Sequence, residues 1–387
     1  MIIENCNIIY LDKIEQGSIL IENGKIKEIN PAKYCDENIL DANGLYVSPG
    51  FIDVHIHGAG GYDTLDSTSQ AINTIAKTIV KHGTTAFTPT TMTVSIEDIR
   101  KSLSVIKTLK KIGSEGAHVL GVHLEGPFVS QKAIGAQNPK HILSPSISTY
   151  NDIVKDYEDI IVSITLAPEI DGAKELIKYI SDTGVVCSLG HTNATYEEMV
   201  EAITCGASHS THLYNTMTPL NHRNPGAVGA IFDSSITTET ISDGIHISYP
   251  ALRIAYKQKG TDNVLLISDA MMACCMPNGE YSLGGQKVIV NNDEARLENG
   301  ALAGSVLTID KAVRNVYKNS NLPLHEIVKM ASFNGARHCK VDDHKGQIKE
   351  GYDADLILFD DDINIKKVFI LGKEYCDIQL DKDIDLC

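Results

Sequence analysis

The stretch FIDVHIHGAGG, residues 51–61, decides the fold and introduces the chemistry. Its apolar start predicts a buried strand over 51–57, and its glycines predict a loop after that strand. Side chains alternate along a strand, so His55 and His57 project to the same side. Two imidazoles with this spacing can chelate one metal ion, although a pair of buried, hydrogen-bonded histidines is the structural alternative. Their position at the entrance to a glycine-rich loop favours metal ligands.

Seven further short apolar runs follow along the chain, and amphipathic segments separate them. The pairs Ser95 with Asp98 and Thr195 with Glu198 resemble capping boxes at helix starts, and Gly83 predicts a helix end. Alternating strands and helices are typical of parallel βα units, and eight such units predict a closed (β/α)8 TIM-like barrel. A doubly wound open sheet is the alternative, but no Gly-x-Gly-x-x-Gly turn follows a strand. The eight predicted strands are 51–57, 84–90, 119–125, 161–167, 185–191, 208–214, 238–243 and 264–269.

Both ends of the chain read as short strands with turns. Residues 18–21 and 25–29 flank the turn Asn23-Gly24, and residues 354–359 and 368–371 alternate in the same way. We therefore expect one small β-sandwich domain built from residues 1–48 and 346–387. The catalytic barrel is expected to span residues 49–345.

Polar residues stand where several of the predicted strands end, and in a barrel those ends form the catalytic face. Glu125, His191, His212 and Asp269 each stand at or near the end of a predicted strand. Taken singly, a surface glutamate, a satisfied core histidine or a turn aspartate explains each of them. Taken together with His55, they are hard to explain as packing. The set predicts a metal site, with Asp269 placed as a general base toward a metal-bound water.

Composition limits the classes of function. The 387 residues carry 34 basic and 50 acidic side chains, a net charge of −16, so nucleic acid and anionic membranes are not expected partners. No signal peptide and no membrane-spanning run is predicted. The nine cysteines include no Cys-x-x-Cys, and the adjacent Cys274 and Cys275 are poorly placed for a mutual bridge. We expect reduced thiols and a cytoplasmic location.

The order of these motifs resembles the amidohydrolase superfamily. The strings HLEGPF, GHTNA, THLYNTM, NPGAVGA, DGIH, SDAMMA and LAGSVLT are similar to those of the N-acetylglucosamine-6-phosphate deacetylases, and the resemblance covers nearly the whole chain. It implies hydrolysis of the acetamide of N-acetylglucosamine 6-phosphate to glucosamine 6-phosphate and acetate, a step of amino-sugar catabolism. The metal would activate the water, and Asp269 would act as general base and then as general acid.

The resemblance also assigns the metal and its ligands. Glu125, His191 and His212 would hold the catalytic ion. Because this sequence keeps His55 and His57, a second ion is expected, with Glu125 able to bridge the two. The expected metal is Zn²⁺, one or two ions per chain, with Fe²⁺, Mn²⁺ and Co²⁺ as alternatives.

Further residues are implied to bind the phosphorylated amino sugar. Arg223 would reach the phosphate of a neighbouring subunit, which implies a homodimer. Gln137 departs from the family, which carries a histidine there, and this is either a neutral exchange or a change in hexosamine preference. The alternatives are an N-acetylgalactosamine-6-phosphate deacetylase, another amidohydrolase, or a catalytically dead paralogue that binds a ligand. The other expected contacts are Ala136, Asn215, Thr216, His246, Leu302, Ala303 and Gly304.

Overall fold

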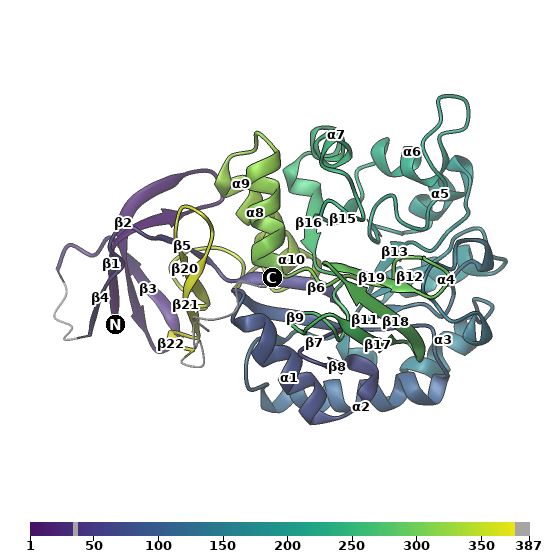
Figure 1. Ribbon diagram of the computed structural model, residues 1–387, viewed down its shortest axis with the longest axis horizontal. Coiled ribbons are helices and arrows are strands. Elements are labelled where there is room, and N and C mark those ends of the chain that lie inside the picture. The colour runs from purple at the N-terminus through teal and green to yellow at the C-terminus, as the bar shows by residue number, and fades with distance from the viewer. Residues whose placement is uncertain (34–37, 376–387) are drawn as a thin grey trace.

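The computed structural model describes residues 1–33 and 38–375. Two parts of the predicted small domain, residues 34–37 and 376–387, lie outside the described residues. The described chain forms a barrel at one end and a smaller sheet at the other, and the purple N-terminal strands lie beside the yellow C-terminal ones (Figure 1).

The parallel barrel sheet has a strand at each of the eight predicted positions, although the predicted strand 208–214 is reduced to His209–Ser210. Its ladder runs β10-β9-β11-β12-β13-β14-β15-β16, with β6 paired to β9. Two hydrogen bonds just after the paired strand residues bring the last strand to the first. The backbone amide of Asp269 donates to the carbonyl of His55 at 2.9 Å, and the backbone amide of His57 donates to the carbonyl of Ala270 at 2.8 Å. The third predicted strand is split in two, because Gly121 has φ of 151°. The strands are β6 Phe51–Ile56, β9 Thr84–Thr91, β10 His118–Val119, β11 Val122–Glu125, β12 Ile161–Leu166, β13 Val186–Leu189, β14 His209–Ser210, β15 Thr237–Ile241 and β16 Val264–Ile267.

Helices cover the outside of the barrel, and their apolar faces pack on the strands. Ser95 accepts the amide of Asp98 at the start of α2, and Thr195 and Glu198 form the predicted capping box before α5. No helix within residues 1–33 and 38–375 is both long and apolar enough to cross a bilayer. The helices are α1 Ser69–Val80, α2 Ile96–Ile112, α3 Ile147–Val154, α4 Ala173–Asp182, α5 Tyr196–Thr204, α6 Gly226–Phe232, α7 Tyr249–Lys259, α8 Ile309–Asn319, α9 Leu324–Ala331 and α10 Phe333–His338, with the short 3₁₀ helices η1 Thr64–Asp66, η2 Gln131–Ala133, η3 Pro139–His141, η4 Glu158–Ile160 and η5 Thr261–Asn263.

Strands from both ends of the described chain share one eight-stranded sheet, in agreement with the predicted pairing of the two strand-rich ends. The hairpin turn at Asn23-Gly24 joins β2 to β3, and β20 pairs with β5 across more than 300 positions of sequence. Ile3, Ile19, Ile26, Leu356 and Phe369 belong to a separate apolar core inside this sheet. The strands are β1 Ile2–Ile9, β2 Ile14–Glu22, β3 Lys25–Ile29, β4 Ile39–Asp41, β5 Tyr46–Pro49, β20 Leu356–Phe359, β21 Ile365–Ile370 and β22 Lys373–Glu374.

A three-stranded antiparallel sheet, which the sequence interpretation missed, follows the last barrel strand. It comprises β17 Gly279–Leu283, β18 Gln286–Asn291 and β19 Glu294–Leu297, and it is drawn in green in Figure 1. The Gly284-Gly285 pair between β17 and β18 is a two-residue hairpin signal that could have identified it. Leu283 lines the cavity described below, and Gln286 donates to the carbonyl of Ala136 at 2.5 Å, so this sheet forms part of the site. A short hairpin of β7 Gly58–Ala59 and β8 Tyr62–Asp63 lies after the first barrel strand.

Candidate metal-dependent active site

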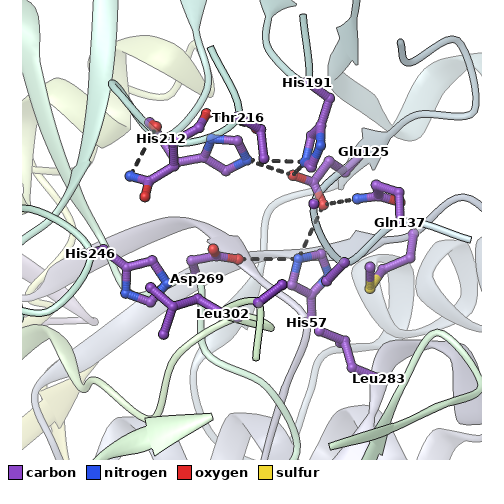
Figure 2. A pocket seen from close by; sticks show the side chains of 16 residues that line it. His57, Glu125, Gln137, His191, His212, Thr216, His246, Asp269, Leu283 and Leu302 are labelled. Atoms are coloured by element: carbon purple, nitrogen blue, oxygen red, sulfur yellow. Dashed lines mark hydrogen bonds and ion pairs between the residues drawn. The ribbon is translucent and has the colours of Figure 1, made fainter. Parts of the chain in front are cut away.

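A cavity of about 170 Å³ lies at the carboxyl ends of the barrel strands. Polar side chains from separate strands converge on it, as Figure 2 shows for His57, Glu125, His191, His212 and Asp269. The residues lining it are His57, Met92, Glu125, Gly135, Ala136, Gln137, His191, His212, Asn215, Thr216, His246, Asp269, Leu283, Ala301, Leu302 and Gly304.

Glu125, His191 and His212 form the tightest group in this cavity. Glu125 Oε1 lies 3.1 Å from Nε2 of each histidine, and the two Nε2 atoms lie 3.2 Å from each other. In a tetrahedral site with bonds of about 2.1 Å, ligand atoms are about 3.4 Å apart. The three ligand atoms therefore already have the mutual spacing of a coordination shell. His191 Nδ1 lies 3.1 Å from the carbonyl of Ala133, which orients Nε2 toward the site.

His55 and His57 meet the same glutamate from the first strand. His55 Nε2 lies 3.5 Å from Glu125 Oε1, and His57 Nε2 lies 3.3 Å from Glu125 Oε2. His55 Nε2 is buried and has no hydrogen-bond partner among the described residues. An orphaned nitrogen facing a carboxylate fits a cation between them, and the two histidines with Glu125 form a second possible ligand group.

Asp269 completes the ring of side chains around the cavity. Its Oδ1 lies 3.2 Å from His57 Nε2 and 3.4 Å from His55 Nε2, and its side chain is 10% exposed. Burial raises the pKa of Asp269, but the neighbouring His55 and His57 outweigh burial and leave this pKa below its ordinary value. Burial likewise opposes ionisation of Glu125, and His55 and His191 hold its pKa well below its ordinary range. Asp269 is thus an ionised carboxylate that can accept a proton at the cavity wall.

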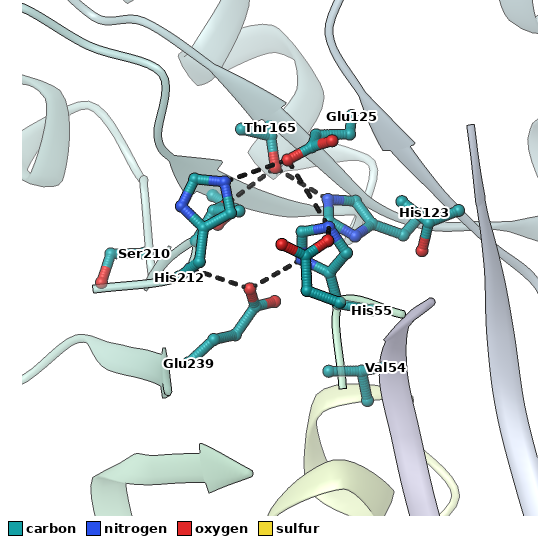
Figure 3. Close-up of polar contacts among 12 residues, drawn as sticks. Val54, His55, His123, Glu125, Thr165, Ser210, His212 and Glu239 are labelled. Atoms are coloured by element: carbon teal, nitrogen blue, oxygen red, sulfur yellow. Dashed lines mark hydrogen bonds and ion pairs between the residues drawn. The ribbon is translucent and has the colours of Figure 1, made fainter. Parts of the chain in front are cut away.

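Beneath the cavity lies a buried glutamate that the sequence interpretation missed. Glu239 Oε2 lies 2.9 Å from His55 Nδ1 and accepts the backbone amide of His212 at 3.0 Å, so it stands between these two histidines in Figure 3. Its Oε1 lies 3.2 Å from His209 Nε2. Glu239 therefore fixes the ring of His55 and the backbone of His212. It is the only acidic residue in β15, and a lone carboxylate in a buried strand was the available signal.

His123 also belongs to this buried layer. Its Nε2 lies 2.7 Å from Thr165 Oγ1, and its ring packs edge-on against His55 with centroids 4.5 Å apart. Burial and then the nearby charge of His55 lower the pKa of His123 to about 3, so this ring is neutral near pH 7. The group His55, His123 and Glu239 has metal-ligand spacing. Neither His123 nor Glu239 lines the cavity, and both serve as packing and hydrogen-bonding support.

The residues expected to bind substrate separate into three groups. Ala136, Gln137, Asn215, Thr216, His246, Leu302 and Gly304 line the cavity. Ala303 is fully buried and is not part of the lining. Arg223 lies on an exposed loop before α6, also outside the lining. The lining residues include no lysine or arginine.

Gln137 has a different set of contacts from those expected. Its Nε2 donates to Glu125 Oε2 at 2.7 Å, and its Oε1 accepts the backbone amide of Thr93 at 2.7 Å. The side chain is only 2% exposed. Both ends of the amide are therefore occupied by protein groups, and Gln137 orients Glu125. The sugar contact predicted from the sequence stays a prediction.

The chain belongs to the amidohydrolase family, whose model matches residues 46–375. Members of that superfamily are metal-dependent, in agreement with the ligand groups above. Within it, this chain is similar to N-acetylglucosamine-6-phosphate deacetylases. The relative from Lysinibacillus sphaericus is 40% identical over 96% of this chain and 97% of its own length.

A solved structure and a second relative extend this similarity. The crystal structure of N-acetylglucosamine-6-phosphate deacetylase from Pasteurella multocida aligns with a TM-score of 0.92 at 31% identity, over 97% of this chain and 99% of that one. An N-acetylgalactosamine-6-phosphate deacetylase from Escherichia coli O157:H7 is 32% identical over 93% of this chain and 95% of its own length.

Proposed function

We propose that this protein hydrolyses the acetamide of N-acetylglucosamine 6-phosphate, giving glucosamine 6-phosphate and acetate. One observation carries the proposal: Glu125, His191 and His212 have metal-ligand spacing, and Asp269 faces them across a cavity. The relative from Lysinibacillus sphaericus and the structure from Pasteurella multocida, both named for this activity, support the choice of substrate.

The protein residues divide the work around a divalent cation held by Glu125, His191 and His212. When bound, such a cation polarises an amide carbonyl and makes a coordinated water more acidic. Asp269 takes the proton of the attacking water and returns it to the departing amine, which is otherwise a poor leaving group. His246 also faces the cavity, and its Nδ1 lies 2.6 Å from Asp243 Oδ2, which leaves Nε2 to contact the substrate.

We further propose that the cation is Zn²⁺ and that each chain holds two. The nitrogen-rich ligand set suits zinc, and His55 and His57 supply a second group that shares Glu125. Elemental analysis of protein purified without chelators should approach two metals per chain. The double variant His55→Ala, His57→Ala should retain about one. Wild type that never exceeds one ion under metal repletion would reject the second ion.

We assign the phosphate contact to Arg223 of the neighbouring subunit in a homodimer. The cavity lining includes no lysine or arginine, and Arg223 is exposed on its own subunit. A guanidinium suits bidentate phosphate binding. Mixing Arg223→Ala chains with Asp269→Asn chains should restore activity through hybrid dimers, because one of the two sites then has both groups. Absence of recovery despite proven subunit exchange would count against a shared site.

The second candidate is deacetylation of N-acetylgalactosamine 6-phosphate, which the Escherichia coli relative favours by its name. Acetate release measured on both epimers decides between the two. A preference for the gluco substrate supports the first proposal, and a preference for the galacto substrate replaces it. No release from either, in protein with a full complement of metal, would support a ligand-binding paralogue without catalysis.

Two further expectations stay predictions. The division of the chain at residues 48/49 and 345/346 is supported by the separate apolar core of the terminal sheet and can be checked by limited proteolysis. The cytoplasmic location can be checked by cell fractionation.

A further inference from the structure

A cysteine, a histidine and an aspartate lie in contact outside the active site. Cys275 Sγ lies 3.2 Å from His82 Nε2, and His82 Nδ1 lies 3.3 Å from Asp310 Oδ1. Cys275 is on the loop after β16, His82 follows α1, and Asp310 is in the first turn of α8. A thiol next to an imidazole that is ion-paired with a carboxylate resembles the arrangement that activates a nucleophile.

The charges around this thiol favour its ionised form. Cys274, and then His82, lower the pKa of Cys275 well below its ordinary value, against the effect of burial. Burial opposes a charge on His82, but Asp310 and Cys275 raise its pKa well above the ordinary value. Three further charges stand nearby. Arg314 lies 3.5 Å from Asp310 Oδ2, and Lys311, whose Nζ lies 3.2 Å from Asp293 Oδ2, borders the same cavity.

A cavity of about 460 Å³ gives small molecules access to the thiol. His82, Cys275, Met276, Asn292, Val306 and Lys311 are among its lining residues. A volume of this size accommodates a small organic molecule. It is separate from the cavity of the metal-dependent site, because the two linings share no residue.

The neighbouring Cys274 does not offer a simple way to resolve an adduct on Cys275. The two sulfur atoms lie 3.8 Å apart. Their α-carbons, joined by a trans peptide, are about 3.8 Å apart, whereas disulfides ordinarily need about 4.4–6.8 Å. A mixed disulfide on Cys275 is therefore expected to persist.

Main-chain hydrogen bonds connect the Cys275 loop to the active site. The carbonyl of Cys274 accepts the amide of Gly60 at 2.9 Å, and the carbonyl of Ala270 accepts the amide of His57 at 2.8 Å. The same loop begins at Asp269, so it links Cys275 both to the general base and, through these hydrogen bonds, to the strand end that carries the metal-ligating histidines.

We propose that Cys275, His82 and Asp310 form a reactive-thiol site that takes up low-molecular-weight disulfides and thereby slows turnover at the neighbouring active site. The Cys275 thiolate attacks one sulfur of the disulfide, forming a new S–S bond. The original S–S bond breaks, and its electron pair leaves with the second thiolate. His82 keeps its proton and stabilises the attacking sulfur. The effect on turnover rests on the proposed deacetylase function, whereas the reactivity of the thiol does not.

The first test measures thiol reactivity alone, using iodoacetamide and mapping of the labelled peptides. At pH 6, Cys275 should react at least about tenfold faster than the partly exposed Cys205, because the imidazole of His82 beside Cys275 favours the thiolate, which is the form that reacts with iodoacetamide. His82→Gln and Asp310→Asn should each slow the labelling of Cys275 by iodoacetamide. In His82→Gln, the labelling rate of Cys275 should rise about tenfold per pH unit from pH 6 to pH 8. The proposed reactive-thiol site would be overturned if Cys275 were labelled as slowly as Cys205, or if neither variant changed the labelling rate of Cys275.

The second test uses 2-hydroxyethyl disulfide as the probe on the metal-loaded protein. Intact mass should show one adduct that depends on Cys275, with acetate release slowed several-fold and restored by dithiothreitol. Cys275→Ser should keep its basal activity and resist the probe, whereas the matched control Cys205→Ser should respond like wild type. A full adduct on Cys275 with unchanged turnover would overturn the regulatory role.

Discussion

Two clusters of buried charge in this molecule differ in whether protein side chains alone balance their charges. At the barrel mouth, Glu125 and Asp269 face several histidines around a cavity, and His55 Nε2 has no hydrogen-bond partner among the described residues. Where the chain returns to the terminal sheet, Lys345 Nζ lies 2.7 Å from Asp353 Oδ2 and 2.6 Å from Asp355 Oδ2.

The second cluster is complete in itself. Lys25 pairs with the other oxygen of Asp353 at 2.5 Å, and the amide of Leu371 donates to Asp355 Oδ1 at 2.8 Å. Two lysines thus balance two aspartates. The first cluster is complete only with a cation that its ligand atoms share. Buried charge with internal partners indicates structure, whereas buried carboxylates and histidines whose ligand atoms have metal-ligand spacing indicate function.

Removing a metal ligand should have the largest effect. His191→Ala or His212→Ala should reduce acetate release to the level of metal-stripped wild type, because the coordination shell loses one of three protein ligands. Elemental analysis should show the lost ion, and circular dichroism should show an unchanged fold. Full activity with a normal metal content in either variant would contradict the assignment of these ligands.

Asp269→Asn should lower kcat by about 10²–10⁴-fold while metal content and sugar binding persist, because an amide cannot accept the proton of the attacking water. Steady-state kinetics measures the expected loss in kcat, and calorimetry measures whether the variant still binds the sugar. Near-normal turnover would show that another group is the base.

Lys345→Met should instead reduce stability and leave kcat unchanged. Removing one partner of a buried ion pair costs about 3–5 kcal/mol of unfolding free energy. Urea unfolding measures this loss. Lys107→Met is the control, because Lys107 pairs with Asp159 on the exposed surface and its removal should cost less than about 1 kcal/mol of unfolding free energy. Equal losses in the two variants would remove the distinction between the clusters.

The same ion pair predicts a pH dependence. Burial raises the pKa of Asp353, but Lys25 and Lys345 outweigh it and lower this pKa below its ordinary value. A lowered folded-state pKa contributes stability that is present above the unfolded-state pKa of about 3.9 and is lost as pH falls through the folded value. Between pH 7 and pH 3, wild type should therefore lose stability relative to Lys345→Met. A constant difference across this range would argue against the pair.

Glu239→Gln should weaken metal binding by about 10–100-fold, the usual cost of removing a group that orients a metal-ligating histidine. The amide keeps the size of the side chain but loses the charge that faces His55 Nδ1. Competition with a metal chelator gives the affinity, and excess metal should restore most of the turnover. Loss of stability with unchanged metal affinity would assign Glu239 to folding alone.

Gln137→His should have the smallest effect, a change of less than about tenfold in kcat/KM, because a histidine can still donate to Glu125. Assays on both epimers separate two roles. A change on one epimer only would indicate that this position sets hexosamine specificity, and an equal change on both would indicate that it acts through Glu125.

Much of the fold follows from local sequence. All eight predicted barrel strands overlap observed ones, although β14 is much shorter than predicted, and the four predicted terminal strands overlap β2, β3, β20 and β21. The β17–β19 sheet was missed although β18 alternates buried and exposed residues and Gly284-Gly285 forms a two-residue turn, which are both strand-hairpin signals. The split of the third strand at Gly121 depends on a backbone angle that the letters alone do not specify.

The sequence by itself determined which residues gather at the candidate site, because strand alternation places His55 and His57 together and strand ends in a barrel share one face. Only the tertiary structure decided their partners. Glu239 contacts His55, which is 184 residues away in the sequence, and Cys275 contacts His82, which is 193 residues away. The side chain of Gln137 donates a hydrogen bond to Glu125. The physical reason is that periodicity is set by neighbouring residues, whereas these contacts exist only once the barrel has closed and brought distant segments together.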